Sequence, residues 1–340
     1  CVELLKKMIK RSYILLKFSI LQNYPTIQKY TYMHDLSTIY SKVRNCISTH
    51  AKDYFAYGEN IQFYPREPKM SDLEIISLSV AAECLQIDSE NLLWSKIKKD
   101  YPTLFPHLIH RTKFNLRRKR LTNLLSDCLS NLADYIHNSI HSDYLIIDSM
   151  PLPTCKLVRE FQSKICRNPQ KDEIIADKGK NAIMGGWYIG YKFHLITSSS
   201  GIYRDFMITG ASVHDNFYLK KLTKEDTHLQ GVELLGDRGY IGKAVQTRLF
   251  EELDLQLNIP YRKNQKDFQP YDKGKKIIRK TIEVVFSQYC DEFMIRRNYA
   301  KRFSGLLTRI MTKIMAKTFK QYINLTNGNP INQTKHALAA

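Results

Sequence analysis

The spacing of apolar residues divides the chain into a helical first part and a strand-rich second part. Up to about residue 140, apolar positions recur every three or four residues, as they do on one face of a helix. The capping-box pair Ser71 and Glu74 predicts one helix start, and Ser89 predicts another. A third helix is expected from about 111 to 139. The sequence therefore predicts a mainly helical domain over residues 33–140.

After residue 140, short β-rich segments alternate with helical ones. Three successive strands with short links favour an antiparallel meander, and the alternation that follows favours a mixed sheet covered by helices. The predicted fold class is α/β, with the element order β-β-β-α-β-α-β-α. Strands are expected over 144–148, 187–197, 202–209, 232–235 and 255–259, and helices over 215–225, 243–253 and from 277 onward. A basic loop at 261–276 and a possible insertion at 159–181 interrupt this order.

The two ends of the chain stand apart from these domains. Residue 1 is Cys, whereas Met33 has the residue type of a translation start. Residues 1–32 are therefore either an upstream extension or part of a genuine but truncated N-terminus, and the sequence does not separate the two. Residues 326–340 are expected to form a polar tail, which leaves 141–325 as the second domain.

The charge of the chain is strongly basic, with 52 Lys and Arg against 33 Asp and Glu and a net charge of +19. Such a field attracts polyanions, so nucleic acid is the leading partner, and a basic but unspecific surface is the alternative. Six of the ten residues in 111–120 are basic. They are expected to contact DNA phosphates from a helix-turn-helix-like domain, unless they form a merely solvated face.

A second basic region, 257–320, holds sixteen Lys and Arg and five Asp and Glu, interleaved with aromatic residues. It is expected to flank the active site and bind phosphates, or else to be an amphipathic helix whose aromatics fill the core. The spacing of Phe303, Leu307, Ile310 and Ile314 predicts one buried stripe. That stripe would leave three cations free outside it: Arg302, Arg309 and Lys313.

The seven cysteines are scattered and form no C-x-x-C pair. This pattern argues against a disulfide framework and a zinc ribbon, and it indicates a reducing cytoplasm. The apolar stretch from Tyr13 to Leu21 is interrupted by Lys17 and is far shorter than the roughly 18 residues of a membrane span. We therefore expect no membrane association, no secretory signal and a cytoplasmic location.

Three acidic residues are placed where chemistry is possible. Asp148 ends the first predicted strand, Asp237 ends the fourth between Gly236 and Gly239, and Glu283 borders the apolar stripe of the helix at 277–295. Clustered carboxylates repel one another unless a cation neutralises them, and hard oxygen ligands suit a pair of Mg²⁺ or Mn²⁺ ions for phosphoryl displacement. Taken singly, each has a structural alternative: a turn cap, an Asx-type turn residue and a solvated helix residue.

Five segments together resemble a known family of enzymes: IIDSMPLP (146–153), GWYIGYKFHLI (186–196), ITGASVHD (208–215), LLGDRGYIG (234–242) and RKTIEVVFSQ (279–288). They resemble the DDE transposases of bacterial insertion sequences, most closely the IS982 type within the wider family of IS4 and IS5 types. The resemblance runs from about 70 to 325. It implies an RNase H-like catalytic fold and a homo-oligomer that cuts double-stranded DNA and joins it to a target. It gives the metal-ligand roles for two Mg²⁺ or Mn²⁺ ions to Asp148, Asp237 and Glu283.

The sequence departs from the family pattern at two accessory positions. Related transposases often carry a Tyr three residues before an Arg and a Lys seven residues after the Glu. Here Arg279 is in place, but positions 276 and 290 are Lys and Cys. His194 is expected to be a packed sheet residue, and Asp215 to open a helix. The residues expected to contact DNA are Arg111, Lys113, Arg117, Arg118, Arg120, Arg238, Arg262, Lys263, Arg279, Arg296 and Arg297.

Two other functions remain open at this point. One is a metal-dependent nuclease of the same fold that cuts DNA and never joins it. The other is a non-catalytic DNA-binding relic of a transposase. The complete acidic set argues against the relic, because without a catalytic demand such a set would be lost readily.

Overall fold

The first part of the chain is helical, as predicted. The computed structural model describes residues 35–140, 142–167, 173–181, 186–261, 264, 268–297 and 299–339. Ser71 and Glu74 form the predicted capping box, and the Ser89 hydroxyl accepts a hydrogen bond from Leu92 N at 3.4 Å. The helices of this part are α3 (Leu36–His50), α4 (Asp72–Cys84), α5 (Glu90–Asp100), α6 (Arg111–Arg120) and α7 (Thr122–Ser139). The predicted extension 1–32 lies outside the described residues.

The helix predicted over 111–139 is two helices. Leu121 separates α6 from α7, and the Thr122 hydroxyl donates to the Lys119 carbonyl at 2.7 Å across the break. A side-chain hydrogen bond of this kind competes with the regular backbone hydrogen bonds of a helix. The spacing of apolar residues does not reveal such a break. The basic run therefore occupies a short helix of its own.

Within the described residues, six strands form one mixed sheet. β1 runs antiparallel to β3, whose other edge pairs with β2 and β4, while β5 is parallel to β1 and β6 is parallel to β5. The five predicted strands are present, and β2 lies in the stretch set aside as an insertion. The strands are β1 (Tyr144–Cys155), β2 (Asp177–Asn181), β3 (Gly186–Ser198), β4 (Tyr203–Gly210), β5 (Glu233–Leu235) and β6 (Gln256–Asn258).

β1 is much longer than the predicted 144–148, and it continues through Pro151 and Pro153. The parallel pairing with β5 ends at Ile146 opposite Leu235, so beyond that point β1 pairs along one edge with β3. Proline is tolerated on a strand with an open edge because no ladder hydrogen bond is lost there. The strand therefore continues through both prolines, which stay paired with Lys192 and Gly190 of β3.

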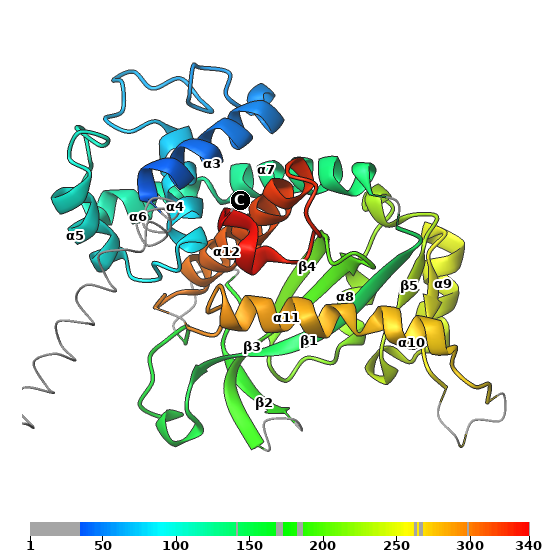
Figure 1. Cartoon of the computed structure of the whole chain (residues 1–340). Helices are drawn as coiled ribbons and strands as arrows, with labels where there is room; N and C mark the ends of the chain where they lie inside the picture. The colour runs from blue at the N-terminus through cyan, green and yellow to red at the C-terminus, as the bar shows by residue number, and fades with distance from the viewer. Residues whose placement is uncertain are drawn as a thin grey trace, which may run out of the picture.

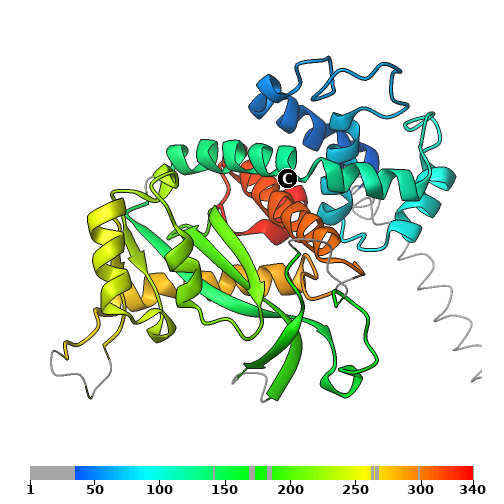
Figure 2. The ribbon, with the colours of Figure 1, turned by 180° about the vertical axis from the view of Figure 1, so that it is seen from behind.

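Helices cover both faces of the sheet. α11 (Thr281–Asp291) crosses one face in Figure 1, where Phe193 packs against Tyr289. α8 (Asn216–Lys221) and α9 (Lys243–Leu253) cover the other face, seen from behind in Figure 2, where Ile147 belongs to a second core. The helix predicted from 277 begins earlier and is divided at Lys280, with α10 (Lys273–Arg279) before the division.

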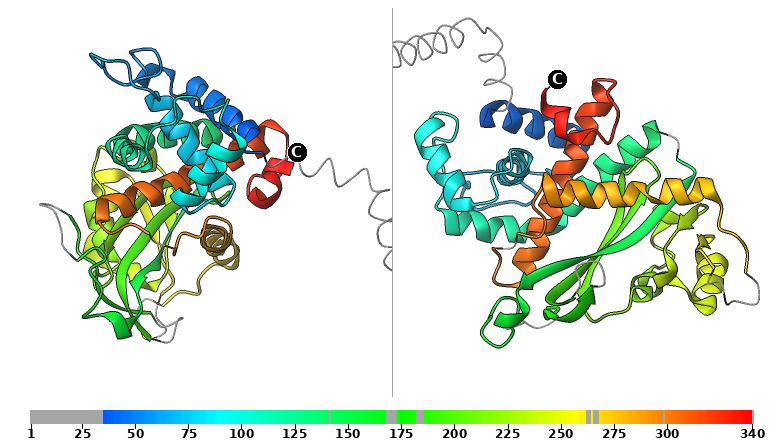
Figure 3. Two further views of the ribbon diagram at one scale, coloured as in Figure 1. Left: turned by 90° about the vertical axis from the view of Figure 1, so that its left-hand side faces the viewer. Right: turned by 60° about the horizontal axis from the view of Figure 1, so that its bottom comes forward.

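The long C-terminal helix α12 (Phe303–Thr326) packs against α4 and α7 and also touches β4 (Figure 3). The prediction that Arg309 and Lys313 lie free outside a buried stripe is therefore wrong: they are only 6% and 1% exposed. α12 is covered around most of its circumference, so its cations pair inside the protein. Of the three cations, Arg302 alone is exposed as predicted.

The residues predicted as a polar tail fold back onto α12 through a 3-10 helix (Thr334–Ala339). The buried Thr334 hydroxyl donates to Glu292 Oε1 at 2.7 Å. Among the helices in the described part of the chain, none combines the length and apolar character needed to cross a membrane. Further 3-10 turns occur at Lys52–Tyr54, Leu157–Arg159, Thr227–Leu229 and Arg238–Tyr240.

Candidate active site

The register of the parallel pair β1 and β5 brings two aspartates together. Ile146 pairs with Leu235, and each is followed two residues later by an aspartate, Asp148 and Asp237. Because parallel strands run in the same direction, both aspartates leave the pair at the same end. The expectation that Asp148 ends its strand is wrong, since β1 continues to Cys155, but Asp148 does follow the end of the β5-paired segment.

Asp237 lies in a tight turn that depends on glycine. Its Oδ1 accepts a hydrogen bond from Gly239 N at 2.7 Å, which is the Asx-type contact considered as an alternative. A Cβ at Gly239 would lie 2.9 Å from that oxygen and 3.1 Å from Asp215 Oδ2. The carboxylates of Asp237 and Asp215 thus flank Gly239 closely, and any larger residue would collide with one of them.

Asp148 is the most perturbed carboxylate of this group. The pKa of Asp148 is raised to about 7, chiefly by burial and also by the negative charges of Asp237 and Asp215, whereas the Ser149 N–H and Arg279 oppose the rise. The Ser149 N–H donates to Asp148 Oδ1 at 2.8 Å. Asp148 therefore holds its proton more tightly than an exposed carboxyl does.

Arg279 connects Asp148 with Glu283. Its guanidinium nitrogens lie 4.0 Å from Asp148 Oδ2 and 4.0 Å from Glu283 Oε1. Alternate strand residues face opposite sides, so Asp148 faces the sheet side covered by α11, where Glu283 occurs in the first turn. The Glu283 side chain is 60% exposed, while the neighbouring Ile282 is fully buried. The structure thus brings Asp148 and Glu283 together at Arg279, close to the point where the pairing of β1 with β5 ends.

Sequence reasoning missed Asp215 as a site residue. It occupies the N-cap position of α8, as expected, but its side chain makes no capping hydrogen bond. Instead, Asp215 Oδ1 accepts from the Ser149 hydroxyl at 3.0 Å and from Lys192 Nζ at 3.2 Å. The one sequence feature that could have pointed to Asp215 is its place in the segment 208–215, which resembles the transposase family. His194 is a packed sheet residue as predicted, and burial lowers its pKa to about 4.

The donor set suits a hard divalent cation in chemical terms, because every donor is a carboxylate oxygen. Among the residues that the structure describes, no three His, Cys, Asp or Glu side chains are grouped closely enough to hold a metal ion. The Arg279 guanidinium lies between Asp148 and Glu283 and separates their charges. The register of β1 and β5 makes Asp148 and Asp237 the pair that would begin a metal site, and Glu283 would have to approach them to complete it.

The cations predicted to contact DNA fall into three sets. Lys113, Arg120, Arg238 and Arg296 are exposed. Arg117, Arg118, Arg111 and Arg297 are paired with carboxylates of the helical part, and Arg279 with those of the active site. Arg262 and Lys263 lie outside the described residues. The run 111–120 is therefore not one solvated basic face, because Arg118 is buried and Arg117 mostly so.

Comparison with known proteins bears on the segment that contains these carboxylates. Residues 138–299 match the family model described as a transposase DDE domain, and Asp148, Asp237 and Glu283 all fall within the match. This segment is similar to transposase DDE domains. The match supports a transposase function.

The fold was also compared with solved structures. A cryo-electron-microscopy structure of a piggyBac transposase synaptic complex with hairpin DNA resembles the chain with a TM-score of 0.41 and 11% sequence identity. The resemblance covers 89% of this chain and 76% of that one. No curated protein matches the sequence.

Proposed function

We propose that the protein is a transposase that cleaves double-stranded DNA at the ends of an insertion sequence and transfers the cut strands into a target. The observation that carries the proposal is the meeting of Asp148 and Glu283 at Arg279, with Asp237 in register beside Asp148. These residues come from three separate elements of the segment similar to transposase DDE domains. A carboxyl with a raised pKa beside further acids, such as Asp148, is more frequent at functional sites than elsewhere, which supports the proposal.

Asp148, Asp237 and Glu283 would hold two Mg²⁺ or Mn²⁺ ions, which when bound would supply charge stabilisation for in-line phosphoryl displacement. Asp148 must release its proton to act as a ligand, and its raised pKa makes that step pH-dependent. Arg279 would exchange its contacts with Asp148 and Glu283 for a DNA phosphate. Arg238, exposed beside Asp237, would hold a neighbouring phosphate.

Further parts of the proposal extend to the whole chain. The mixed sheet is assigned an RNase H-like character, and residues 33–140 are assigned to DNA binding. A homo-oligomer would bring two element ends together, in the bacterial cytoplasm where the chromosome lies. The helical part supports its assignment through the exposed cations Lys113 and Arg120.

The first prediction concerns Asp237→Asn. The substitution preserves shape and removes one ligand charge, so Mg²⁺-dependent cleavage of DNA that carries the element end should fall by roughly 100-fold or more. DNA binding should survive, because the cations that attract phosphates are unchanged. Cleavage and binding are measured side by side for wild type, Asp237→Asn and the control Glu251→Gln, an exposed residue of α9.

The outcomes separate the possible functions. Strand transfer by wild type into a second DNA distinguishes a transposase from a nuclease of the same fold. If wild type binds DNA and cuts with neither Mg²⁺ nor Mn²⁺, the catalytic proposal fails and the DNA-binding relic becomes the better account. An equal loss of cleavage in Glu251→Gln would show that the effect does not come from the site.

A further inference from the structure

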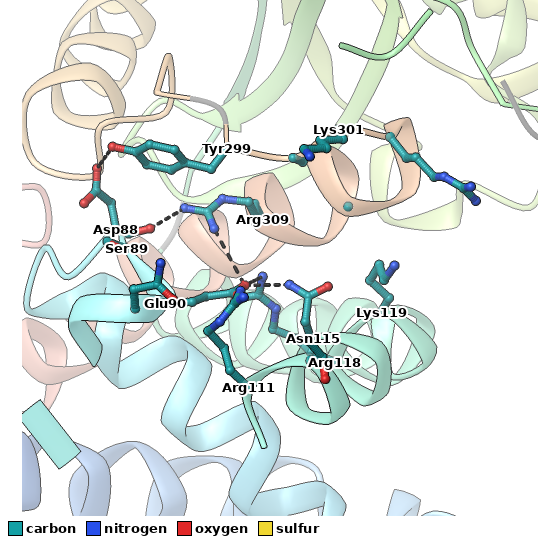
Figure 4. Close-up of a pocket in the computed structure, with 15 residues that line it drawn as sticks. Asp88, Ser89, Glu90, Arg111, Asn115, Arg118, Lys119, Tyr299, Lys301 and Arg309 are labelled. Atoms are coloured by element: carbon teal, nitrogen blue, oxygen red, sulfur yellow. Dashed lines mark hydrogen bonds and ion pairs between the residues drawn. The ribbon is translucent and has the colours of Figure 1, made fainter. Parts of the chain in front are cut away.

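A cavity of about 440 Å³ lies away from the candidate active site, between the helical part and the start of α12 (Figure 4). Its wall is formed by the residues that open α5 and α6 and by the segment 299–305. None of these residues belongs to the group around Asp148. A volume of this size is within the range of ligand-binding pockets.

The lining of the cavity is predominantly cationic. Against two acids, Asp88 and Glu90, it holds six basic residues: Arg111, Arg118, Lys119, Lys301, Arg302 and Arg309. Within the described part of the chain, no carboxylate forms an ion pair with Lys119, Lys301 or Arg302. The positive charge therefore exceeds what folding of this region requires.

The two acids are shared among several donors. Glu90 Oε1 accepts from Asn115 at 2.6 Å and from Arg118 at 2.9 Å, and it lies 3.9 Å from Arg309 Nη1. Arg309 also donates to the Asp88 carbonyl at 2.6 Å. Arg118 and Arg309 are 7% and 6% exposed, and the Nε of each is buried with no hydrogen-bond partner in the described structure. Both guanidinium groups thus line the cavity as fixed positive charges, held by Glu90 and by the Asp88 carbonyl.

Backbone groups add to the same field. The N-terminal turns of three helices reach the cavity, through Ser89 and Glu90 of α5, Arg111 and Thr112 of α6, and Arg302 and Gly305 of α12. A helix N-terminus carries partial positive charge and attracts anions, and here three of them converge with the six cationic side chains.

We infer that this cavity binds a backbone phosphate of DNA, with Lys301, Arg302 and Lys119 as its direct contacts and the buried Arg118 and Arg309 as its positive floor. Tyr299, which is 60% exposed at the rim, packs its ring against the Arg309 guanidinium, whose Cζ lies 5.4 Å from the ring centroid. The inference rests on the proposed function for DNA as the ligand, and it adds a contact site in a part of the molecule remote from the carboxylates. Such contacts fix the position of DNA independently of its sequence.

The test uses the full chain and a random-sequence duplex, because a phosphate contact needs no particular bases. Lys301→Ala with Arg302→Ala removes two exposed cations at the cavity. The control is Lys98→Ala with Lys99→Ala, which removes two exposed cations from the opposite end of α5. The cavity variant should bind DNA roughly tenfold more weakly, and the slope of log affinity against log salt should fall by up to roughly 1, because the cavity neutralises one phosphate. The control should retain the slope of wild type.

Chemical protection provides a second measurement on the unchanged protein. DNA should protect Lys119 and Lys301 from acetylation and leave Lys98 and Lys99 reactive. Equal weakening by both double variants, or protection absent at Lys119 and Lys301, overturns the inference. So does tight binding of deoxyadenosine monophosphate or inorganic phosphate by wild type with unchanged DNA affinity of the cavity variant, because the ligand is then a small phosphate compound.

Failure of the proposed function looks different. If wild type binds no duplex at low salt, the DNA-dependent function and this inference fall together. If wild type binds and cleaves DNA while the cavity variant does the same with equal affinity, the cavity inference alone is wrong.

Discussion

At the residue scale, Asp148 shows how a candidate metal ligand destabilises the protein that carries it. Its carboxyl has an ordinary pKa of 3.8, and burial with two neighbouring aspartates raises the pKa to about 7. Between these values the folded protein holds a proton that the unfolded chain releases. The free energy of unfolding therefore decreases as pH rises from about 4 to 7, and the full loss is present above pH 7.

Asp148→Asn should therefore stabilise the metal-free protein at pH 8 and have little effect near pH 4. A shift of one pKa unit corresponds to about 1.4 kcal/mol, but 23% of the Asp148 side chain is exposed and solvent screens part of the effect. We expect a gain of about 1–2 kcal/mol, measured by urea unfolding in EDTA across this pH range. A gain that is independent of pH would contradict the assigned cause, and Glu251→Gln should show no gain.

The turn at Asp237 can be predicted from the sequence because its signal is local, whereas the metal-ligand role of Asp237 stays a prediction. Gly236 and Gly239 beside an acid after an apolar strand describe one turn, and that turn is present. Asp215 could not be assigned in the same way. Its partners Ser149 and Lys192 lie on other strands, and no spacing along the chain reveals such contacts.

At the scale of elements, α6 shows what composition alone conceals. The run 111–120 is a helix, so its cations point in different directions around the axis. Arg117 contacts the fully buried Asp72, and Arg118 contacts Glu90, while Lys113 and Arg120 face solvent. Composition predicted a basic helix correctly, but it could not separate structural cations from those free to meet DNA.

Lys113→Ala with Arg120→Ala should weaken DNA binding by roughly three- to tenfold and flatten its salt dependence, while thermal stability stays within about 0.5 kcal/mol of wild type. Arg117→Ala should instead lower the thermal stability and leave the salt dependence of DNA binding unchanged, because it leaves Asp72 without its cation. Binding titrations at several salt concentrations and thermal unfolding of both variants check the division. If Arg117→Ala alone flattens the salt slope, the assignment of exposed and structural cations is wrong.

The strands were predicted in order and number except for β2, because alternating and apolar runs are strong local signals. The lengths and the pairing of the strands could not be predicted equally well from the sequence. The extension of β1 past Pro151 depends on the pairing with β5 ending at Ile146. That pairing joins residues far apart in the chain, so local sequence patterns do not show it. The same fact places Asp148 beside Asp237, so the site geometry could be anticipated only through the family resemblance.

At the scale of the whole molecule, α12 joins the helical part to the sheet. It packs against α4 and α7 on one side and against β4 and α11 on the other. Four of the sixteen cations in 257–320 lie on this helix and are buried: Arg309, Lys313, Lys317 and Lys320. Three of them pair with acids, Arg309 with Glu90, Lys313 with Glu83 and Lys320 with Glu292. Part of the basic content of this region therefore holds α12 in place and is not free to meet DNA.

The contact between Lys313 and Glu83 tests whether the two halves are one cooperative unit. Both side chains are buried, and Lys313→Ala would leave the Glu83 charge unpaired inside the protein, at a cost of about 3–5 kcal/mol. Combining Lys313→Met with Glu83→Gln removes both charges and should recover most of that loss. The two tryptophans report the halves separately, since Trp94 lies in α5 and Trp187 in β3.

In single-tryptophan backgrounds made with Trp94→Phe and Trp187→Phe, Lys313→Ala should lower both fluorescence midpoints in urea together, because α12 belongs to the core on each side of it. Each background serves as its own reference, so any effect of the tryptophan substitution cancels. A lowered midpoint at Trp94 with an unchanged one at Trp187 would mean that α12 stabilises the helical part alone. The helical part and the sheet would then be independent domains, and DNA bound at one could reach the carboxylates of the other only through a flexible connection.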